Sequence, residues 1–466
     1  MTNSSIKMFP KVKGFPGPKT RKILKDLAKY ESQGDLCFTN YGNTPPVVKD
    51  AKGVFVRDVD GNVFLDLTSG FAALNLGHCP KEVIEAAYKQ MKTVHHTAQQ
   101  PTEVRVQLAK KLVEIAPGKL KNRSKVQFDT GGTNAVEVGM KIAKACKKRP
   151  YILCYHGAYH GRSHGTLSVT CFPFLKENFF PIMPGAVRIA YPYCYRCPFG
   201  RSYPNCEMFC AKHIENMFND PTWGLIDRKK GTNLVAGLLF EPAQGAGGYI
   251  IPPDEYWKEV RRICEKYDVL LIDDEIQMGW GRSGQMFSIE AFDTYPDIMM
   301  VGKSFTAGVI PNAAIIAPVK IMDVLKPIHQ SVTFSGNPVG AAAALAMMET
   351  IEKRNLLDHV RKMGAYFLDR LNELMEKHPL IGQVQGKGFI LSLEFVKDRQ
   401  TKEPFESMNV VKEALKRGLL LTVSGHFGNR LNIVPPLITT RSEIDIGVKI
   451  LDETIGAVEK RCLKKS

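Results

Sequence analysis

The sequence of 466 residues predicts an α/β protein whose central sheet is mostly parallel. Two observations lead to this fold class. Several short apolar runs of strand length each end in a polar or glycine-rich turn, and segments with helical spacing follow some of them. The chain is also long enough for two or three domains, at roughly 100 to 200 residues a domain. We therefore expect at least one large hydrophobic core.

Five apolar runs are expected to form strands of the largest domain. They are Val126–Phe128, Tyr151–Tyr155, Leu234–Phe240, Val269–Ile272 and Ile298–Val301. Helical spacing of apolar residues follows the first and the third run, at Asn134–Lys148 and Tyr256–Tyr267. Ligands of open parallel sheets bind outside the carboxyl ends of the strands. The turns after these five strands should therefore converge on one site.

The two ends of the chain are expected to build a second, smaller α+β domain. We assign residues 1–71 to it because Val54–Leu67 has a strand-turn-strand pattern. Residues 72–336 form the large domain in this interpretation, and residues 337–466 complete the small one. This last portion is expected to mix helices and strands: helices Ala341–Glu352 and Asp358–Lys377, strands Phe389–Phe395 and Leu419–Val423.

Composition excludes several classes of protein. Apolar residues make up 44% and charged residues 24% of the chain, ordinary globular values that argue against a disordered, collagenous or coiled-coil protein. The longest nearly apolar stretch, Gly340–Met348, is far shorter than the ~20 residues that a membrane helix requires. The N-terminus also lacks an apolar run suited to a signal peptide. We expect a cytoplasmic protein with no membrane partner.

Basic residues exceed acidic ones by 63 to 47, which gives a net charge of +16. A field of this sign attracts anionic ligands or nucleic acid. Part of the excess belongs to residues 1–30, where the only acidic side chain is Asp26. The sequence contains no zinc finger, no RNP pattern and no basic heptad, so we do not expect a nucleic-acid partner.

Eleven cysteines in a chain without a secretion signal indicate reduced thiols. Four of them have the spacing C-x2-C-x8-C-x3-C: Cys194, Cys197, Cys206 and Cys210. Four thiolates can hold a structural zinc ion. The central gap is shorter than the common zinc spacings, however, and no histidine takes part. The alternative is an aromatic-rich loop without metal, and we assign no metal ligand from the sequence alone.

Three expected strand ends carry groups that suit a single cofactor. The turn Asp129–Thr133 lies between a strand and a helix, where backbone N–H groups and the helix dipole favour a phosphate. Asp274 ends an apolar strand, where a carboxylate needs a cationic partner such as a pyridinium nitrogen. Lys303 follows another apolar strand, where desolvation makes an amine a better nucleophile. Together these groups meet the requirements of pyridoxal phosphate.

Four sequence blocks resemble the class III aminotransferases, which are pyridoxal-phosphate-dependent enzymes of fold type I. The blocks are LLFEPAQGAGG, LLIDDEIQMGWGRSG, PDIMMVGKSF and TFSGNP, and the resemblance extends from Tyr41 to Leu437. It implies that Lys303 binds the cofactor covalently and moves a proton on the substrate. It also implies that Asp274 keeps the pyridine nitrogen protonated, so that the ring accepts electrons.

The resemblance implies further cofactor residues. Gln277 would lie near the phenolic oxygen of the ring, and Tyr159 would stack on the ring. Gly132 and Thr133 match the phosphate loop, although the usual Ser-Gly-Thr/Ala-Glu is replaced here by Gly-Gly-Thr-Asn. Thr333 matches a residue that reaches the phosphate of a neighbouring subunit. A shared site of this kind requires a homodimer or a dimer of dimers.

The residues expected to bind substrate depart from the family pattern. Many relatives bind an α-carboxylate with an arginine before a Pro-Pro pair and displace that arginine with a glutamate. In this sequence Asn432 stands at the position of the arginine, and Ala246 stands at the position of the glutamate. Arg430 is a candidate replacement two residues earlier, and Arg162 matches a substrate-binding arginine of several ω-aminotransferases. Two aromatic residues match positions that line the substrate pocket: Tyr41 and Phe71.

We expect an aminotransferase that moves the amino group of a β- or ω-amine to 2-oxoglutarate or pyruvate. The missing ionic pair and the basic charge fit a donor whose carboxyl is masked by coenzyme A, such as 3-aminobutyryl-CoA. Amino-acid racemases or epimerases and amino-phosphonate lyases of the same family are the alternatives. A racemase needs proton delivery on both faces of Cα, and the sequence identifies no second acid or base for this.

Overall fold

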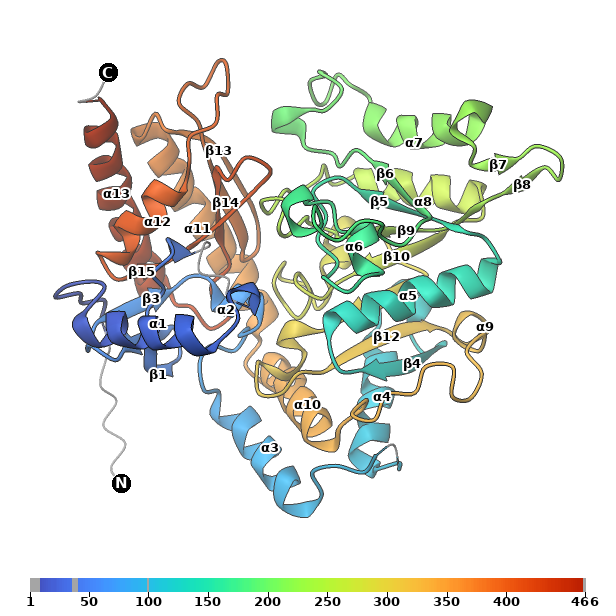
Figure 1. The fold of residues 1–466 in the computed structure, drawn as a ribbon, viewed down its shortest axis with the longest axis horizontal. Helices are drawn as coiled ribbons and strands as arrows, with labels where there is room; N and C mark the ends of the chain where they lie inside the picture. Colours follow the sequence, from blue (N-terminus) through green and yellow to red (C-terminus); the bar gives the residue numbers. More distant parts are fainter. Residues whose placement is uncertain (1–8, 36–40, 99, 464–466) are drawn as a thin grey trace. The chain divides into compact units, whose positions relative to one another are not determined.

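The computed structural model describes residues 9–35, 41–98 and 100–463, which divide into two compact units (Figure 1). Unit 1 comprises residues 1–80 and 358–466, and unit 2 comprises residues 81–357. The domain boundaries predicted after residues 71 and 336 both lie earlier in the chain than the observed boundaries, which follow residues 80 and 357. The second boundary differs because α10 (Pro338–Lys353) packs against α3 (Lys81–Thr93), which makes this helix part of unit 2.

A seven-stranded sheet forms the centre of unit 2, and only β12 runs against the direction of the others. The strand order is β4 (Ser124–Asp129), β12 (Ala313–Pro318), β11 (Ile298–Val301), β10 (Leu270–Asp274), β9 (Val235–Phe240), β5 (Tyr151–Tyr155) and β6 (Ala186–Ile189). All five predicted strands are present in this sheet, and their carboxyl ends lie at one edge. This confirms the prediction of a mostly parallel sheet.

Two strands of the large sheet were not predicted, β6 and β12. The sequence of β12, AAIIAP, contains three alanines, and alanine favours a helix over a strand in isolation. Its place between β4 and β11 buries most of its residues and overrides this preference. The pairing of β12 with its two neighbours, and not its local sequence, therefore makes this segment a strand.

Unit 2 also contains helices, several of which contact strands of the sheet. The helices are α3, α4 (Glu103–Ile115), α5 (Gly132–Lys147), α6 (Thr166–Val169), α7 (Phe209–Asn219), α8 (Tyr256–Lys266), α9 (Val319–Met322) and α10. Helix α5 contacts β9 and β11, and it buries Val136, Met140 and Ala143 as its apolar spacing predicted. Short elements complete the unit: 3-10 helices η3 (Gly118–Leu120), η4 (Pro173–Leu175), η5 (Cys194–Arg196), η6 (Pro221–Trp223), η7 (Ser288–Phe292) and η8 (Lys303–Thr306), and the hairpin of β7 (Ile226–Asp227) and β8 (Thr232–Asn233).

Unit 1 contains two four-stranded sheets and joins both ends of the chain. One sheet has the order β1 (Val48–Lys52), β2 (Phe55–Asp58), β3 (Val63–Asp66) and β15 (Leu419–Leu420). The other has the order β13 (Ile381–Lys387), β14 (Ile390–Phe395), β17 (Arg430–Ile433) and β16 (Thr422–Ser424). The remaining elements are α1 (Pro18–Tyr30), η1 (Gln33–Asp35), α2 (Ser69–Ala72), α11 (Leu356–Lys377), α12 (Met408–Leu415) and α13 (Arg441–Leu463).

The strand predicted at Leu419–Val423 is two strands that belong to different sheets. β15 pairs in parallel with β3, where Leu419 lies opposite Leu65, whereas β16 pairs with β17. The parallel pairing of β15 with β3 unites the N-terminal and C-terminal portions. This confirms a smaller α+β domain built from the chain ends.

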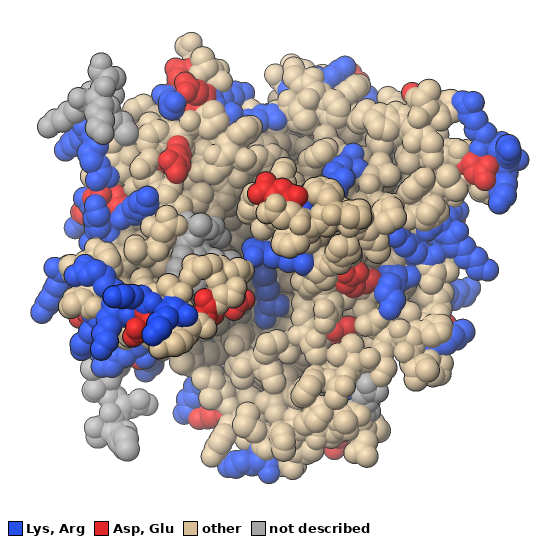
Figure 2. All heavy atoms as spheres, viewed as in Figure 1, with Lys and Arg blue, Asp and Glu red and all other residues tan. Residues whose placement is uncertain are grey.

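Lys and Arg side chains gather on α1 in Figure 2. This helix carries five basic side chains and one acidic one: Lys19, Arg21, Lys22, Lys25, Lys29 and Asp26. Part of the net positive charge is therefore concentrated on one surface helix. Among the described helices, none combines the length and the apolar character needed to cross a bilayer.

Candidate active site

The carboxyl edge of the large sheet brings together the polar residues predicted to carry chemistry. Asp274 is the last residue of β10, and Lys303 follows β11 after a single glycine. Glu241 follows β9, and Tyr159 lies in the loop after β5. These residues are distant in the chain, but neighbouring parallel strands place their carboxyl ends side by side.

A hydrogen bond to His160 orients the carboxylate of Asp274. The Nδ1 atom of His160 lies 2.7 Å from Oδ2 of Asp274, and both side chains are buried. The backbone N–H of Ile276 donates to Oδ1 at 3.1 Å. Burial by itself lowers the pKa of His160, but the hydrogen bond and the charge of Asp274 outweigh it and raise that pKa. The pair therefore holds one carboxylate in a fixed direction.

Glu241 is a second buried carboxyl group near Asp274. It accepts hydrogen bonds from the backbone N–H of Tyr159 at 3.0 Å and of Gly245 at 2.7 Å. Burial raises the pKa of Glu241 to about 7, and Asp274 adds to the rise while His160 opposes it. Glu241 thus fixes the loop that carries Tyr159, and its carboxyl group titrates close to neutral pH.

The amine of Lys303 has an environment suited to a nucleophile. Burial lowers the pKa of Lys303 to about 8, although the charges of Asp274 and Glu241 oppose the shift, and Arg282 adds to the lowering. The backbone of Lys303 has a φ of 42°, in the left-handed region that a lysine seldom adopts. Residues held in such conformations cluster at functional sites.

Glycines at the start of α5 leave room for an anion. A side-chain carbon added to Gly131 would meet no atom within 4 Å. One added to Gly132 would come 2.9 Å from Ile276, so this glycine permits close packing of the loops after β4 and β10. The first N–H groups of a helix have no partner within the helix, and its dipole favours negative charge there. Thr133 lies in this first turn and is half-buried.

Gln277 lies beside the turn that follows β9. A side-chain carbon on Gly245 would collide with the amide oxygen of Gln277 and would approach Oε2 of Glu241 to 2.9 Å. Gly245 is therefore required for these two polar side chains to lie close together. The guanidinium carbon of Arg162 lies 5.8 Å from the centroid of the Tyr159 ring, within the range of a cation–π contact.

Three other predicted site residues are Thr333 in unit 2 and Tyr41 and Phe71 in unit 1. Thr333 is exposed on unit 2, next to Phe334, whose side chain is 59% exposed. Tyr41 and Phe71 belong to unit 1, where their ring centroids are 5.5 Å apart in an edge-to-face arrangement. Phe71 has a left-handed backbone with a φ of 57°.

The structure argues against the role predicted for Arg430 as a free carboxylate clamp. Arg430 is fully buried, and its Nη1 donates to Glu394 at 2.5 Å. Its Nη2 donates to Ser392 at 2.6 Å and to Gln385 at 3.2 Å. Strands β14 and β17 place Arg430 opposite Glu394, so the positive charge is neutralised inside unit 1. Removing either partner would leave an uncompensated buried charge.

Pyridoxal phosphate fits the residues at the sheet edge. Open space adjoins Gly131 at the N-terminus of α5, where a phosphate would be held. The buried carboxylate of Asp274 suits a protonated ring nitrogen, and the amine of Lys303 suits the aldehyde carbon. The three groups follow β4, β10 and β11 at the same edge.

The lowered pKa of Lys303 predicts how the cofactor-free protein captures pyridoxal phosphate. Only the neutral amine attacks a carbonyl carbon. The rate of capture should therefore rise with pH up to about 8 and level off above it, instead of rising towards the ordinary lysine value of 10.5. Stopped-flow absorbance of the cofactor across this range measures the rate. An apparent pKa near the ordinary value would contradict the desolvated environment.

Two residues of the site were not predicted from the sequence, His160 and Glu241. His160 adjoins Tyr159 in the motif YHGR, and Glu241 follows an apolar strand as Asp274 ends one. Its position at the end of an apolar strand could therefore have indicated Glu241 as a site residue. The contact of His160 with Asp274 joins residues that are 114 positions apart, and no local pattern indicates it.

Comparison with known proteins identifies the family. The family model described as "Aminotransferase class-III" matches residues 38–455. The chain is 36% identical to the leucine/methionine racemase of Thermococcus litoralis, over 89% of this chain and 92% of that protein. It is 34% identical to the adenosylmethionine-8-amino-7-oxononanoate aminotransferase of Geobacter sulfurreducens, over 89% and 92% of the two chains. The solved omega transaminase of Pseudomonas jessenii in complex with PMP matches with a TM-score of 0.85 and 26% identity, over 94% of this chain and 98% of that chain.

The sequence match, the fold and the residues at the sheet edge agree with one another. The family model covers most of the chain, and the solved relative shares nearly its whole length. The chain belongs to the class III aminotransferases and is a pyridoxal-phosphate-dependent transaminase of fold type I.

Proposed function

We propose that this enzyme transfers the amino group of a β- or ω-amine to 2-oxoglutarate or pyruvate. The observation that carries the proposal is the desolvated amine of Lys303 beside the buried carboxylates of Asp274 and Glu241. Such an amine is neutral enough near pH 8 to act as a nucleophile and as a proton carrier. The cofactor, when bound, supplies an electron sink for the substrate carbanion.

Each residue of the site has a role in this proposal. The amine of Lys303 would remove the proton from the donor carbon that carries the amino group and, in the second half-reaction, would give a proton to the keto carbon of the acceptor. The carboxylate of Asp274 holds a proton on the ring nitrogen, and His160 keeps that carboxylate oriented. The N-terminus of α5, with Gly132 and Thr133, binds the phosphate. Two side chains orient the ring: Tyr159 and Gln277.

Two substitutions support a donor that lacks a free α-carboxylate. Ala246 provides no carboxylate where relatives have a switching glutamate, and Asn432 provides no guanidinium. Arg430 cannot supply this missing guanidinium without breaking its buried pair with Glu394. Aliphatic ω-amines, β-amines and β-amino-acyl thioesters such as 3-aminobutyryl-CoA are therefore the proposed donors. In this proposal Tyr41 and Phe71 contact the apolar part of the donor.

A panel of amino donors tests the proposed substrate class. The absorbance change to the pyridoxamine form gives kcat/KM for each donor in single half-reactions. We expect β- and ω-amines or 3-aminobutyryl-CoA to exceed the α-amino acids, apart from the one that regenerates the cosubstrate. If ornithine, 4-aminobutyrate or an α-amino acid gives the highest kcat/KM, the proposal of a donor with a masked carboxylate is wrong.

Racemisation of an amino acid is the second candidate, because the identity to the racemase relative is slightly higher than that to the aminotransferase relative. A racemase exchanges the Cα proton and keeps the amino group. Incubation of single enantiomers in deuterium oxide, followed by chiral chromatography and mass spectrometry, separates the two reactions. A deuterated product of inverted configuration, formed without any keto acid, would favour racemisation.

Arg162 is proposed to bind the carboxylate of the keto-acid acceptor, because it is exposed beside the Tyr159 ring. A hydrogen bond to a charged group contributes ~1.5–3 kcal/mol, so Arg162→Ala should raise the KM for 2-oxoglutarate or pyruvate by roughly 10- to 100-fold. The KM for an uncharged amine should change little. Steady-state kinetics with both substrates measure this, and the exposed Arg228→Ala is the matched control. An equal rise for donor and acceptor would contradict the assignment.

The proposed assembly is a homodimer in which Thr333 reaches the phosphate of the other subunit. Helix α3 supports it, because Ile84, Tyr88 and Met91 are 41%, 60% and 52% exposed and lie on one side of this helix. An exposed apolar stripe of this kind is typical of a surface that another chain covers. Sedimentation velocity of the purified enzyme measures the assembly. A fully active monomer would contradict it.

A further inference from the structure

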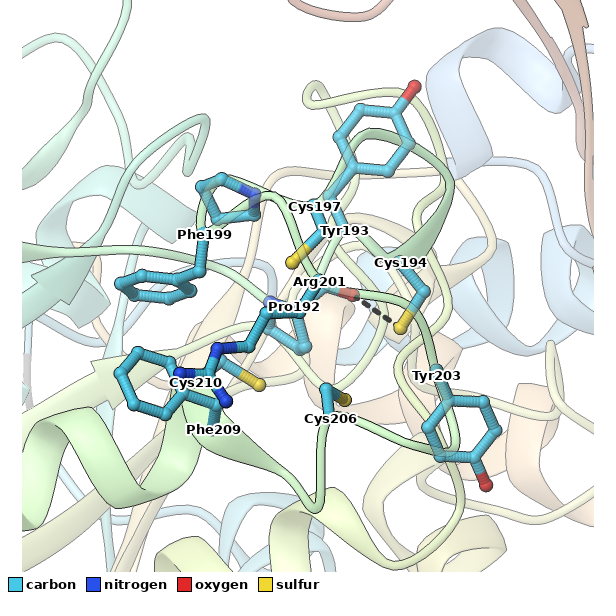
Figure 3. Close-up of a pocket in the computed structure, with 11 residues that line it drawn as sticks. Pro192, Tyr193, Cys194, Cys197, Phe199, Arg201, Tyr203, Cys206, Phe209 and Cys210 are labelled. Carbon is cyan, nitrogen blue, oxygen red and sulfur yellow. Dashed lines mark hydrogen bonds between the residues drawn. The ribbon is translucent and has the colours of Figure 1, made fainter. Parts of the chain in front are cut away.

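Four cysteines that have no part in the proposed chemistry line one small cavity of unit 2. Cys194 belongs to η5, Cys197 follows it, and Cys210 lies in the first turn of α7. Cys206 lies in the loop that connects η5 to α7, called the connecting loop below. The four sulfur atoms surround the cavity in Figure 3. The cavity has a volume of about 20 Å³, enough for about one water-sized sphere.

These thiols differ from the cysteines of the core. Cys154 and Cys264 are fully buried among apolar side chains, where cysteine acts as a small hydrophobic residue. The four cysteines of the cavity are free and only half-buried. They also occur within 17 residues, from η5 through the loop after it to the first turn of α7. Core packing therefore does not explain why this loop has four cysteines.

The four cysteines form one cluster. All four line the same small cavity of unit 2, so their sulfur atoms face a common space (Figure 3). Thiolates gathered in one place repel one another. A cation held between them would remove this repulsion and favour the thiolates.

We propose that Cys194, Cys197, Cys206 and Cys210 form a structural zinc site that closes around the ion when it binds. Among the described residues, no three His, Cys, Asp or Glu side chains are already placed to hold a metal. The sulfur atoms must therefore move inward, to ~2.3 Å from the ion. Each thiol that becomes a ligand loses its proton to solvent, so binding releases up to about four protons.

The connecting loop can make this movement. Its backbone hydrogen bonds are local turns, such as Gly200 to Cys197 at 3.0 Å and Cys206 to Ser202 at 2.9 Å. Shifting the loop therefore breaks no strand pairing. Four thiolates on one zinc ion carry a net negative charge. Arg201, which lines the same cavity with its guanidinium 3.8 Å from the Phe209 ring centroid, can offset part of it.

Metal content of the full-length holoenzyme, purified under reducing conditions from zinc-supplemented cells, tests the site. Plasma mass spectrometry should find about one zinc per chain. Cys197→Ser and Cys206→Ser should lose most of it. Cys79→Ser and Cys146→Ser are matched controls, because these free cysteines do not line the cavity. The controls should keep the zinc.

Cobalt titration of the wild-type chain keeps the test valid if a serine variant misfolds. After removal of zinc by a chelator, Co²⁺ should give a sulfur-to-metal charge-transfer band and the visible bands of a tetrahedral site, with release of protons. Absence of both zinc and these bands in the reduced protein would overturn the proposal. Iron with inorganic sulfide would also overturn it, because an iron–sulfur cluster would then occupy the cysteines. Disulfides among the four after purification under reductant would have the same consequence.

Discussion

Replacing Lys303 with alanine is expected to lower kcat by at least ~10³-fold while the protein stays folded. The change removes both the amine that attacks the cofactor's aldehyde and the group proposed to carry the substrate proton. Lys303 is half-buried and its truncation removes little core area, so thermal stability should change little. Turnover with an active donor and thermal melting by circular dichroism measure the two effects.

The matched control for this variant is Lys320→Ala, an exposed lysine on α9 of the same unit. It should keep wild-type activity. Added methylamine should restore part of the lost rate to Lys303→Ala, because a small free amine can take the place of the missing one. Wild-type transamination by Lys303→Ala would show that the proposed proton carrier is another residue.

Asp274→Asn is expected to lower kcat by about 10²- to 10³-fold and to change cofactor affinity much less. An amide carries no charge that would keep the ring nitrogen protonated, so the bound cofactor becomes a weaker electron sink. The amide also no longer attracts the proton of His160, whose pKa should fall because the charge of Asp274 helps to raise it. Half-reaction kinetics and equilibrium titration with pyridoxal phosphate separate rate from affinity.

The neighbouring residue Asp273 offers a control in the same strand. Burial raises the pKa of Asp273 well above its usual range, with Glu275 and Asp274 adding to the rise. Burial therefore favours the uncharged form of the carboxyl group, and Asp273→Asn replaces it with a neutral group of similar shape. Its kcat should remain close to that of the wild type. Equal losses in the two variants would indicate a general loss of packing in β10 and not a role for the charge of Asp274.

The residues at the strand ends could be predicted because their signals are local. Asp274 and Lys303 each come two residues after the end of a short apolar run, and strands buried on both faces are continuous apolar runs in the sequence. Gly131 and Gly132 mark the turn into α5 in the same way. In an α/β fold, such local signals also locate the ligand edge, because parallel strands end on the same side.

The partners of these residues could not be predicted, because contacts between distant parts of the chain set them. The neutralisation of Arg430 depends on the register of β14 against β17, which places it opposite Glu394. A shift of one residue in that register would turn the arginine to the other face of the sheet. The sequence pattern NRLNIVPPL shows an arginine on a strand and contains no information about this register.

The sequence by itself determined the α/β class, the five parallel strands and the positions of Lys303 and Asp274. Apolar runs and glycine turns act over a few residues, so they can be recognised without the fold. Only the tertiary structure decided that His160 orients Asp274, that Glu241 lies beside them, and that Arg430 is paired. These outcomes depend on which strands and loops become neighbours, and that choice minimises the free energy of the whole core and not of any one segment.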